Sequence, residues 1–521
     1  MAFFSRFIQQ AAKDDTSHHH KNDIVYPVHA LDDNKTFRNS MPTWTMCFND
    51  VLDADRLQQS LTKLLSIGDW KKIGGRLRLK VCYAFIFVSF GEKQHTDMFQ
   101  KEDKRLEIHV PWTFTAERPA FLYSHLDLHQ AIEDHPAAKT LPRPNGNVTM
   151  WTAPKDFHEL ATQKDAPATI EDLLTGDKPQ IAVHVTSFTN ATIVGFTWPH
   201  TLMDAMGLQT LLHSWFLVLS GRESDVPPLL GAQEDVLSTI ADASADMREL
   251  SCISSKEIKG MAKLVFTARS AWDLITTPLP ETRELCLPKK VMASLHQQVQ
   301  QDLAGYSDTS GEDIFVSDSD VLMAWLVHII STTSPNPRPV TVAQGINARF
   351  RFPALINAKG VYVQNMMALN FTLYSPNVAA GPIGPIALET RQQLAEQITE
   401  AQVITNLEAQ RVSGDPFAVL YGDSKAMLIV TANWVKGKFF HITNFGPAVV
   451  RAGDTLEKRC NPPGTPFFQH MFSLSPPAVA IRHFIGTMGK DHGGNFWLKL
   501  VLPSLVWANI EKSLKELETL E

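Results

Sequence analysis

A histidine and an aspartate four residues apart stand between a strand-like segment and an apolar, helix-like segment. In the stretch FTWPHTLMDAMG, His200 directly follows Pro199, and Asp204 begins the next segment. A histidine has an ordinary pKa of about 6.5, so it can take a proton from a hydroxyl group that attacks a carbonyl. This chemistry needs an imidazole that is held in one orientation and left accessible, and a junction between strand and helix offers both. The sequence therefore makes His200 a candidate general base.

The HxxxD spacing leaves two other interpretations open. The same spacing joins His29 to Asp33, in an N-terminal segment that we expect to be a polar leader, where it has little meaning. One alternative is that His200 is a structural histidine whose ring is hydrogen-bonded to a nearby backbone group. His200 and Asp204 can also be two ligands of a metal ion, but no third ligand stands at a suitable spacing, so we predict no metal site.

Regular structure is predicted on both sides of this junction. Apolar residues alternate over 179–198, which predicts a β-hairpin. An apolar helix is predicted over 204–221 and closes at a glycine. The two elements should hold His200 at the end of a sheet.

The rest of the chain mixes helices and strands without a strict β–α rhythm, which favours an α+β fold with one sheet in each half. Helices are predicted over 53–68, 288–305, 317–330, 383–410 and 504–520. Strands are predicted over 76–90, 105–114, 339–352, 366–375, 426–434, 440–446 and 495–503.

Length and composition limit the class of protein. The chain has 521 residues, more than the roughly 250–300 at which a single hydrophobic core stops growing, so we predict two domains. We place them at 1–225 and 256–521, joined by a crossover over 226–255 that is rich in acidic, proline and small residues. The net charge of −7 argues against a partner made of nucleic acid.

The sequence predicts a cytoplasmic protein. The five cysteines are scattered and form no CxxC pair, which is typical of reduced thiols and argues against a zinc site. The longest apolar runs reach about ten residues, whereas a membrane span needs about 20. FFSRFI near the N-terminus is too short for a signal peptide, and HHH at 18–20 is interpreted as a solvated tail.

Short motifs along nearly the whole chain occur in a familiar order. They are IGGRLRL, PHTLMDAMG, VSDSDVLMAW, GINARFRF, YVQN, TANW, HITNFGPA and GGNFWLKLVLP. In this order they resemble the motifs of the BAHD acyltransferases, especially those of fungal secondary metabolism, which carry HxxxDG early and DFGWG late. The resemblance implies two chloramphenicol-acetyltransferase-like domains, each a mixed sheet flanked by helices, with a channel between them.

The same resemblance implies a function. Acyl-CoA, in the simplest case acetyl-CoA, would be a co-substrate rather than a bound cofactor, and a hydrophobic small metabolite would be the acceptor. His200 would deprotonate the hydroxyl or amine of this acceptor, which makes the protein an O-acyltransferase in its main activity. A monomer is implied because the two halves already form the site.

The resemblance also assigns supporting residues. The indole N–H of Trp434 would stabilise the oxyanion, although this tryptophan can also be a core aromatic. Asp204 would turn away from the channel and pair with Arg349, or alternatively with Arg351, and so hold the loop of His200. We do not expect Asp204 to act as a member of a catalytic triad.

Both family motifs carry departures from the family pattern. Ala205 replaces the glycine after the aspartate, and NFGPA, with Asn444 and Gly446, replaces DFGWG. Since asparagine cannot form the ion pair of an aspartate, the packing of the two domains is in question. A non-catalytic binding protein on the same fold is therefore an alternative.

The acyl donor is the second open point. Lys289, Lys290 and Ser317 are candidates to bind CoA phosphates, because these need basic or hydroxyl groups. A condensation-type enzyme that accepts acyl groups from a carrier protein is the alternative, but such enzymes prefer two adjacent histidines, and Pro199 occupies the first place here.

Overall fold

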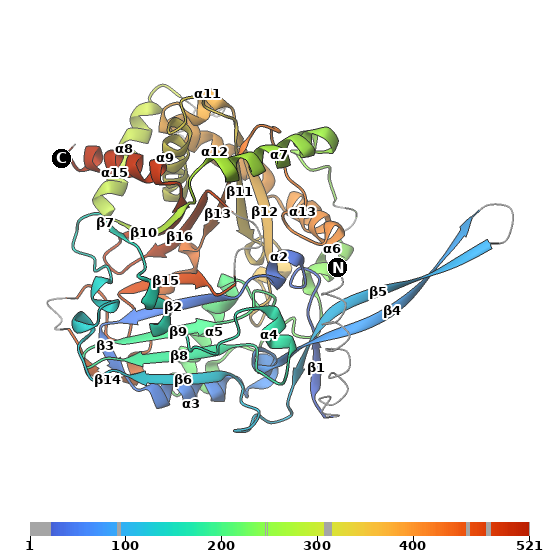
Figure 1. The fold of residues 1–521 in the computed structure, drawn as a ribbon, viewed down its shortest axis with the longest axis vertical. Coiled ribbons are helices and arrows are strands. Elements are labelled where there is room, and N and C mark those ends of the chain that lie inside the picture. The colour runs from blue at the N-terminus through green and yellow to red at the C-terminus, as the bar shows by residue number, and fades with distance from the viewer. Residues whose placement is uncertain are drawn as a thin grey trace.

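The computed structural model describes residues 22–90, 95–244, 246, 248–306, 315–454, 459–475 and 481–519 (Figure 1). The segments FFSRFI and HHH lie outside these residues. Two large hydrophobic cores are present, one containing Trp44 and Trp215 and the other containing Trp325 and Trp507. The predicted α+β fold is confirmed. Within the described residues no helix has the length and apolar character needed to cross a membrane.

A five-stranded sheet forms the first core, with strand order β15-β2-β9-β8-β6. All neighbours are antiparallel except β6 and β8. Trp215 in α5 donates a hydrogen bond to Ser60 in α3 at 2.8 Å, which joins the two long helices of this core. The elements are β2 (Pro42–Phe48), β6 (Leu122–Asp127), β8 (Ala182–Ser187), β9 (Thr192–Thr197), β15 (Phe468–Ser473), α3 (Ala54–Leu64), α4 (Ile170–Leu174) and α5 (Ala205–Leu219).

A seven-stranded mixed sheet forms the second core, with strand order β12-β11-β13-β16-β17-β10-β7. Helices α8, α9 and α15 lie together beside it at the top of Figure 1. Its strands are β7 (Thr149–Trp151), β10 (Glu281–Leu287), β11 (Val340–Asn347), β12 (Met367–Tyr374), β13 (Met427–Asn433), β16 (Phe484–Lys490) and β17 (Phe496–Leu502). Its helices are α8 (Lys289–Asp302), α9 (Asp318–Thr332), α12 (Ile383–Gln397), α13 (Glu400–Ser413) and α15 (Ser504–Thr519).

The two sheets exchange a strand, so the expectation of one sheet in each half is wrong. β15 comes from the second half of the chain but pairs with β2, and β7 comes from the first half but pairs with β10. Gln469 in β15 accepts a hydrogen bond from the indole of Trp44 in β2 at 3.1 Å, which fixes this exchange inside the first core. The domain limits at 225 and 256 stay a prediction.

Smaller elements surround the two cores. The hairpin of β4 (Arg76–Phe90) and β5 (His95–Val110) extends away from the body and pairs with β1 (Ile24–Pro27) (Figure 1). β3 (Asp50–Leu52) pairs with β14 (Val449–Ala452). The crossover region contains α6 (Val236–Ala243), and α7 (Gly260–Thr276) follows it as a helix that the sequence analysis missed.

Two predicted elements differ from the structure. The helix predicted over 383–410 is two helices, because Thr399 caps the second and the Gln397 side chain bonds the backbone of Phe371 instead of facing solvent. The strand predicted over 440–446 is the short helix α14 (Phe439–Ile442) followed by a turn, because the backbone is left-handed at Lys438, with φ of 47°.

Candidate active site

His200 lies in the turn between β9 and α5, and both the N–H and the carbonyl of its backbone make hydrogen bonds. Its N–H donates to the carbonyl of Ser40 at 2.9 Å, and its carbonyl accepts from Nδ2 of Asn365 at 2.7 Å. The imidazole stacks on Phe37, with ring centres 4.1 Å apart and planes within 7°. The turn therefore presents the ring of His200 in one fixed orientation.

The ring of His200 is partly buried, and its Nδ1 has no hydrogen-bond partner among the described residues. Burial lowers the pKa of His200 below its ordinary value, and the charge of Asp204 and the side chain of Asn365 act in the opposite direction. A lowered pKa keeps the imidazole neutral near pH 7. The neutral ring is the form that a general base needs.

Asp204 joins the loop of His200 to the second half of the chain. Its Oδ1 accepts from the backbone of Gly207 at 2.8 Å, which caps α5. Arg349 donates to both carboxylate oxygens at 2.9 and 3.0 Å, and the backbone of Met366 donates to Oδ2 at 3.0 Å. The predicted contact with Arg349, and not with Arg351, is present. Both oxygens are occupied by these donors, which fits a structural role.

We expect Arg349→Met to lower the midpoint of thermal unfolding by about 2–4 °C. The substitution leaves the carboxylate of Asp204 largely buried without its cation, at a cost of about 2 kcal/mol. Arg351→Met is the matched control, since Arg351 forms no ion pair among the described residues, and calorimetry compares the two. An equal shift in both variants would show that the ion pair contributes nothing specific.

Trp434 comes from the second half of the chain and reaches the first core. It follows β13, and its indole meets Trp44 edge-on, with ring centres 5.7 Å apart. In the following 3₁₀ turn, Gly437 lies against Met206 at the start of α5. The structure therefore brings Trp434 beside the helix that follows His200. The indole nitrogen makes no hydrogen bond to another residue that the structure describes.

The NFGPA motif docks the second half onto the first core. The side chain of Asn444 accepts from the backbone of Gly446 at 2.8 Å and so closes its own turn. Phe445 is fully buried, with its ring centre 5.4 Å from that of Phe48 and 4.7 Å from that of Trp215. The halves are thus packed together at this motif although asparagine replaces the aspartate of the family.

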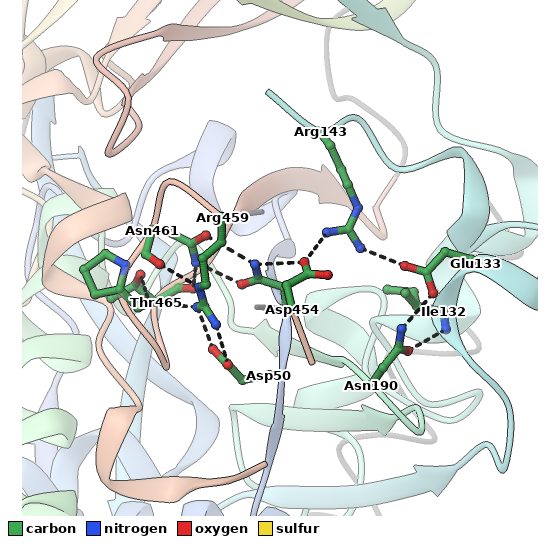
Figure 2. Close-up of polar contacts among 11 residues, drawn as sticks. Asp50, Ile132, Glu133, Arg143, Asn190, Asp454, Arg459, Asn461 and Thr465 are labelled. Carbon is green, nitrogen blue, oxygen red and sulfur yellow. Dashed lines mark hydrogen bonds and ion pairs between the residues drawn. The ribbon is translucent and has the colours of Figure 1, made fainter. Parts of the chain in front are cut away.

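A buried ion pair supports the same junction (Figure 2). Arg459 donates to the two carboxylate oxygens of Asp50 at 2.6 and 2.8 Å, and both side chains are at most 1% exposed. The backbone of Gly464 also donates to Asp50, at 2.7 Å, and its carbonyl accepts from the backbone of Phe445, at 2.7 Å. Asp50 therefore supplies, from the first half, a carboxylate that anchors the NFGPA turn.

The candidate CoA-binding residues lie at two helix starts. Ser317 caps α9, its hydroxyl bonds Asp320, and Arg391 donates to the same hydroxyl at 2.7 Å. Lys289 is exposed and Lys290 is half-buried at the start of α8. The hydroxyl of Ser317 thus already has two partners in the protein. A role in CoA binding stays a prediction for Ser317, Lys289 and Lys290.

Three residues around His200 were not predicted from the sequence, namely Asp32, Asn365 and Phe37. Asp32 accepts from the backbone and side-chain nitrogens of Asn365, at 2.8 and 2.6 Å. Asn365 belongs to YVQN, a motif to which the sequence assigned no role. Asp32 belongs to the segment expected to be a polar leader, and Phe37 follows that segment. His29 and Asp32 are buried, so that expectation was wrong for residues 29–33, and Phe37 is buried as well.

A cavity of about 50 Å³ lies next to the network of Figure 2, lined by residues that include Arg143, Arg459 and His492. Neither His200 nor Trp434 lines it. Within the described part of the chain, no group of three or more His, Cys, Asp and Glu side chains is placed to hold a metal ion.

Known proteins resemble this chain over nearly its whole length. It is 31% identical over 506 residues to the O-acetyltransferase PaAT-2 of Phomopsis amygdali, a match that covers 95% of this chain and 98% of that protein. The chain belongs to the BAHD acyltransferase family. This BAHD protein is also 29% identical over 507 residues to the acetyltransferase adrJ of Penicillium rubens, covering 95% of this chain and 96% of that one. No protein-family model matches the sequence.

Solved structures agree with the fold of this BAHD protein. TRI101 of F. sporotrichioides, complexed with coenzyme A and T-2, superposes with a TM-score of 0.58 at 13% identity, covering 93% of this chain and 96% of that one. The expected fold of two chloramphenicol-acetyltransferase-like domains is confirmed. The names of the sequence relatives identify this BAHD protein as an O-acyltransferase.

Proposed function

We propose that this O-acyltransferase moves an acyl group, in the simplest case acetyl, from acyl-CoA to a hydroxyl group of a hydrophobic small metabolite. Its relatives are named O-acetyltransferase and acetyltransferase, and the similar TRI101 structure holds coenzyme A. The observation that carries the proposal is His200 itself. It is an imidazole with a lowered pKa, fixed at its backbone and at one ring face, in the turn that Asn365 and Arg349 link to the second half.

In the proposed reaction, His200 and Trp434 each have one role. Nε2 of His200 takes the proton of the acceptor hydroxyl while the oxygen attacks the thioester carbonyl. The tetrahedral intermediate collapses, the carbon–sulfur bond breaks, and the thiolate of CoA takes the proton from the imidazolium. The indole N–H of Trp434 donates to the oxyanion. It is available for this because it makes no hydrogen bond to another described residue.

Trp434→Phe is expected to lower kcat by about 10²-fold, because phenylalanine keeps the packing on Trp44 but cannot donate a hydrogen bond to the oxyanion. Steady-state kinetics with acetyl-CoA measures the loss. Trp112→Phe is the matched control, since Trp112 is 73% exposed. An unchanged kcat for Trp434→Phe would remove this tryptophan from the mechanism.

The proposed activity is tested by incubating the purified protein with acetyl-CoA and a panel of terpenoid and polyketide alcohols. Release of free thiol that depends on the alcohol, together with an acetyl ester detected by mass spectrometry, is the expected result. If only an acylated carrier protein supports turnover, the protein is a condensation-type enzyme. If neither donor supports it with any acceptor, the transferase proposal fails.

We further propose that the protein acts as a cytoplasmic monomer. The ion pairs of Asp204 and Asp50 join both halves within one chain, so no second copy is needed to complete the site. Four cysteines in the described residues, Cys47, Cys252, Cys286 and Cys460, are unpaired, which fits a reducing compartment. Size-exclusion chromatography with light scattering tests the monomer.

A further inference from the structure

Asn365 lies where the second half of the chain meets the loop of His200. Its Nδ2 donates to the carbonyl of His200 at 2.7 Å and to Oδ1 of Asp32 at 2.6 Å. Its backbone N–H donates to the same oxygen of Asp32 at 2.8 Å, and both side chains are almost fully buried. Since both partners of Nδ2 are acceptors, the amide group cannot be flipped, and its Oδ1 must point away from them.

Two buried polar atoms at this contact have no hydrogen-bond partner among the described residues, namely Oδ1 of Asn365 and Nδ1 of His200. The first is an acceptor, and the second can carry a proton. Burial lowers the pKa of His200, and its own backbone, the charge of Asp204 and the side chain of Asn365 raise it. In the structure the two atoms are not bonded to each other, but one can donate and the other can accept. A proton on Nδ1 leaves the lone pair of Nε2 free.

We propose that Asn365, oriented by Asp32, is a positioning residue for His200. It holds the backbone of His200 through the carbonyl. In the catalytic complex its Oδ1 would accept the proton on Nδ1, so that Nε2 is the base. This part is played by a carboxylate in a Ser-His-Asp triad. Asp204 cannot play it here, because Arg349 and backbone groups occupy both of its oxygens. The inference rests on the proposed function of His200.

A buried lysine accompanies Asp32. Burial raises the pKa of Asp32 to about 7, and the charge of Lys72 acts in the opposite direction, so Lys72 favours the carboxylate form that accepts both bonds of Asn365. Burial in turn lowers the pKa of Lys72 to about 8, and its Nζ donates to the carbonyl of Ala232 at 2.9 Å. Asp235 also acts on both side chains and Asp69 acts on Lys72, whereas Asp204 acts on His200.

The test is the pH dependence of kcat/KM for Asn365→Ala and Asn365→Asp, measured by thiol release from acetyl-CoA. Asn365→Ala removes the acceptor, so the pKa of His200 falls. The acidic limb of the pH profile of kcat/KM then moves to lower pH, and kcat drops by up to about 10²-fold. Asn365→Asp places a negative charge beside the ring, so the acidic limb moves to higher pH. Loss of rate with the limb unmoved in both variants would mean a merely structural role and overturn the proposal.

Asp32 is tested with a conservative pair. Asp32→Asn keeps an oxygen that accepts from Asn365, so we expect its kcat within a few-fold of the parent. Asp32→Ala removes the acceptor and should behave like Asn365→Ala, with thermal unfolding confirming that both variants are folded. Equal activity of the two Asp32 variants would overturn the part assigned to this aspartate.

His200→Ala separates this inference from the proposed function. If His200→Ala keeps the parent activity, the proposed function itself fails. If His200→Ala loses activity while both Asn365 variants keep the parent kcat and acidic limb, His200 is still the base and only the positioning by Asn365 is wrong.

Discussion

His200→Ala is expected to lower kcat for acetyl transfer by about 10²–10⁴-fold, the range that general-base catalysis contributes. The contacts with Ser40 and Asn365 use the backbone of His200, which alanine keeps, so the loop should stay in place. The loss then reports the missing imidazole and not a displaced loop. Steady-state kinetics with acetyl-CoA should show a fall in kcat with KM for acetyl-CoA nearly unchanged.

His213→Ala is the matched control for this variant. His213 lies in α5, is half-buried like His200, and has a pKa that burial also lowers. It has no part in the proposed chemistry, so its removal should leave kcat within a few-fold of the parent. Equal rates for the two alanine variants would remove His200 from the mechanism.

Arg459→Met is expected to lower the free energy of unfolding by about 3–5 kcal/mol, the largest stability effect that we predict. The carboxylate of Asp50 would stay buried without its cation at the junction of the two halves (Figure 2). Among the described residues, only the backbone of Gly464 would then bond this carboxylate. Urea denaturation measures the change.

Two comparisons isolate this effect. Arg143→Met removes a cation from the same network, but its pairs with Asp454 and Glu133 are partly exposed, so the cost should stay below about 1 kcal/mol. Asp50→Asn added to Arg459→Met removes the unpaired charge and should recover part of the loss. If Arg143→Met costs as much as Arg459→Met, burial does not determine the strength of these pairs.

Local sequence patterns predicted the elements that carry the candidate base. The alternation over 179–198 and the apolar run over 204–221 became β8, β9 and α5, and Asp204 became the helix cap. The contact between Asp204 and Arg349, which are 145 positions apart, came from the order of motifs and not from local spacing. Local patterns predict elements because the hydrophobic period is set within one strand or helix.

Features made by distant residues could not be predicted in this way. The sequences of β7 and β15 contain no signal for the sheet that each strand joins, so the exchange was missed. Asp32 and Asn365 are 333 positions apart, and neither type nor spacing relates them. The strand expected over 440–446 failed because Lys438 adopts a left-handed conformation that its residue type does not indicate.

The most direct test of the account is a crystal structure of the protein with coenzyme A bound. We predict that the sulfur atom of CoA lies within hydrogen-bonding reach of Nε2 of His200, with the indole N–H of Trp434 directed at the same place. Coenzyme A bound only in the cavity beside Arg143 and Arg459, with Nε2 of His200 closed off by packed side chains, would contradict the account.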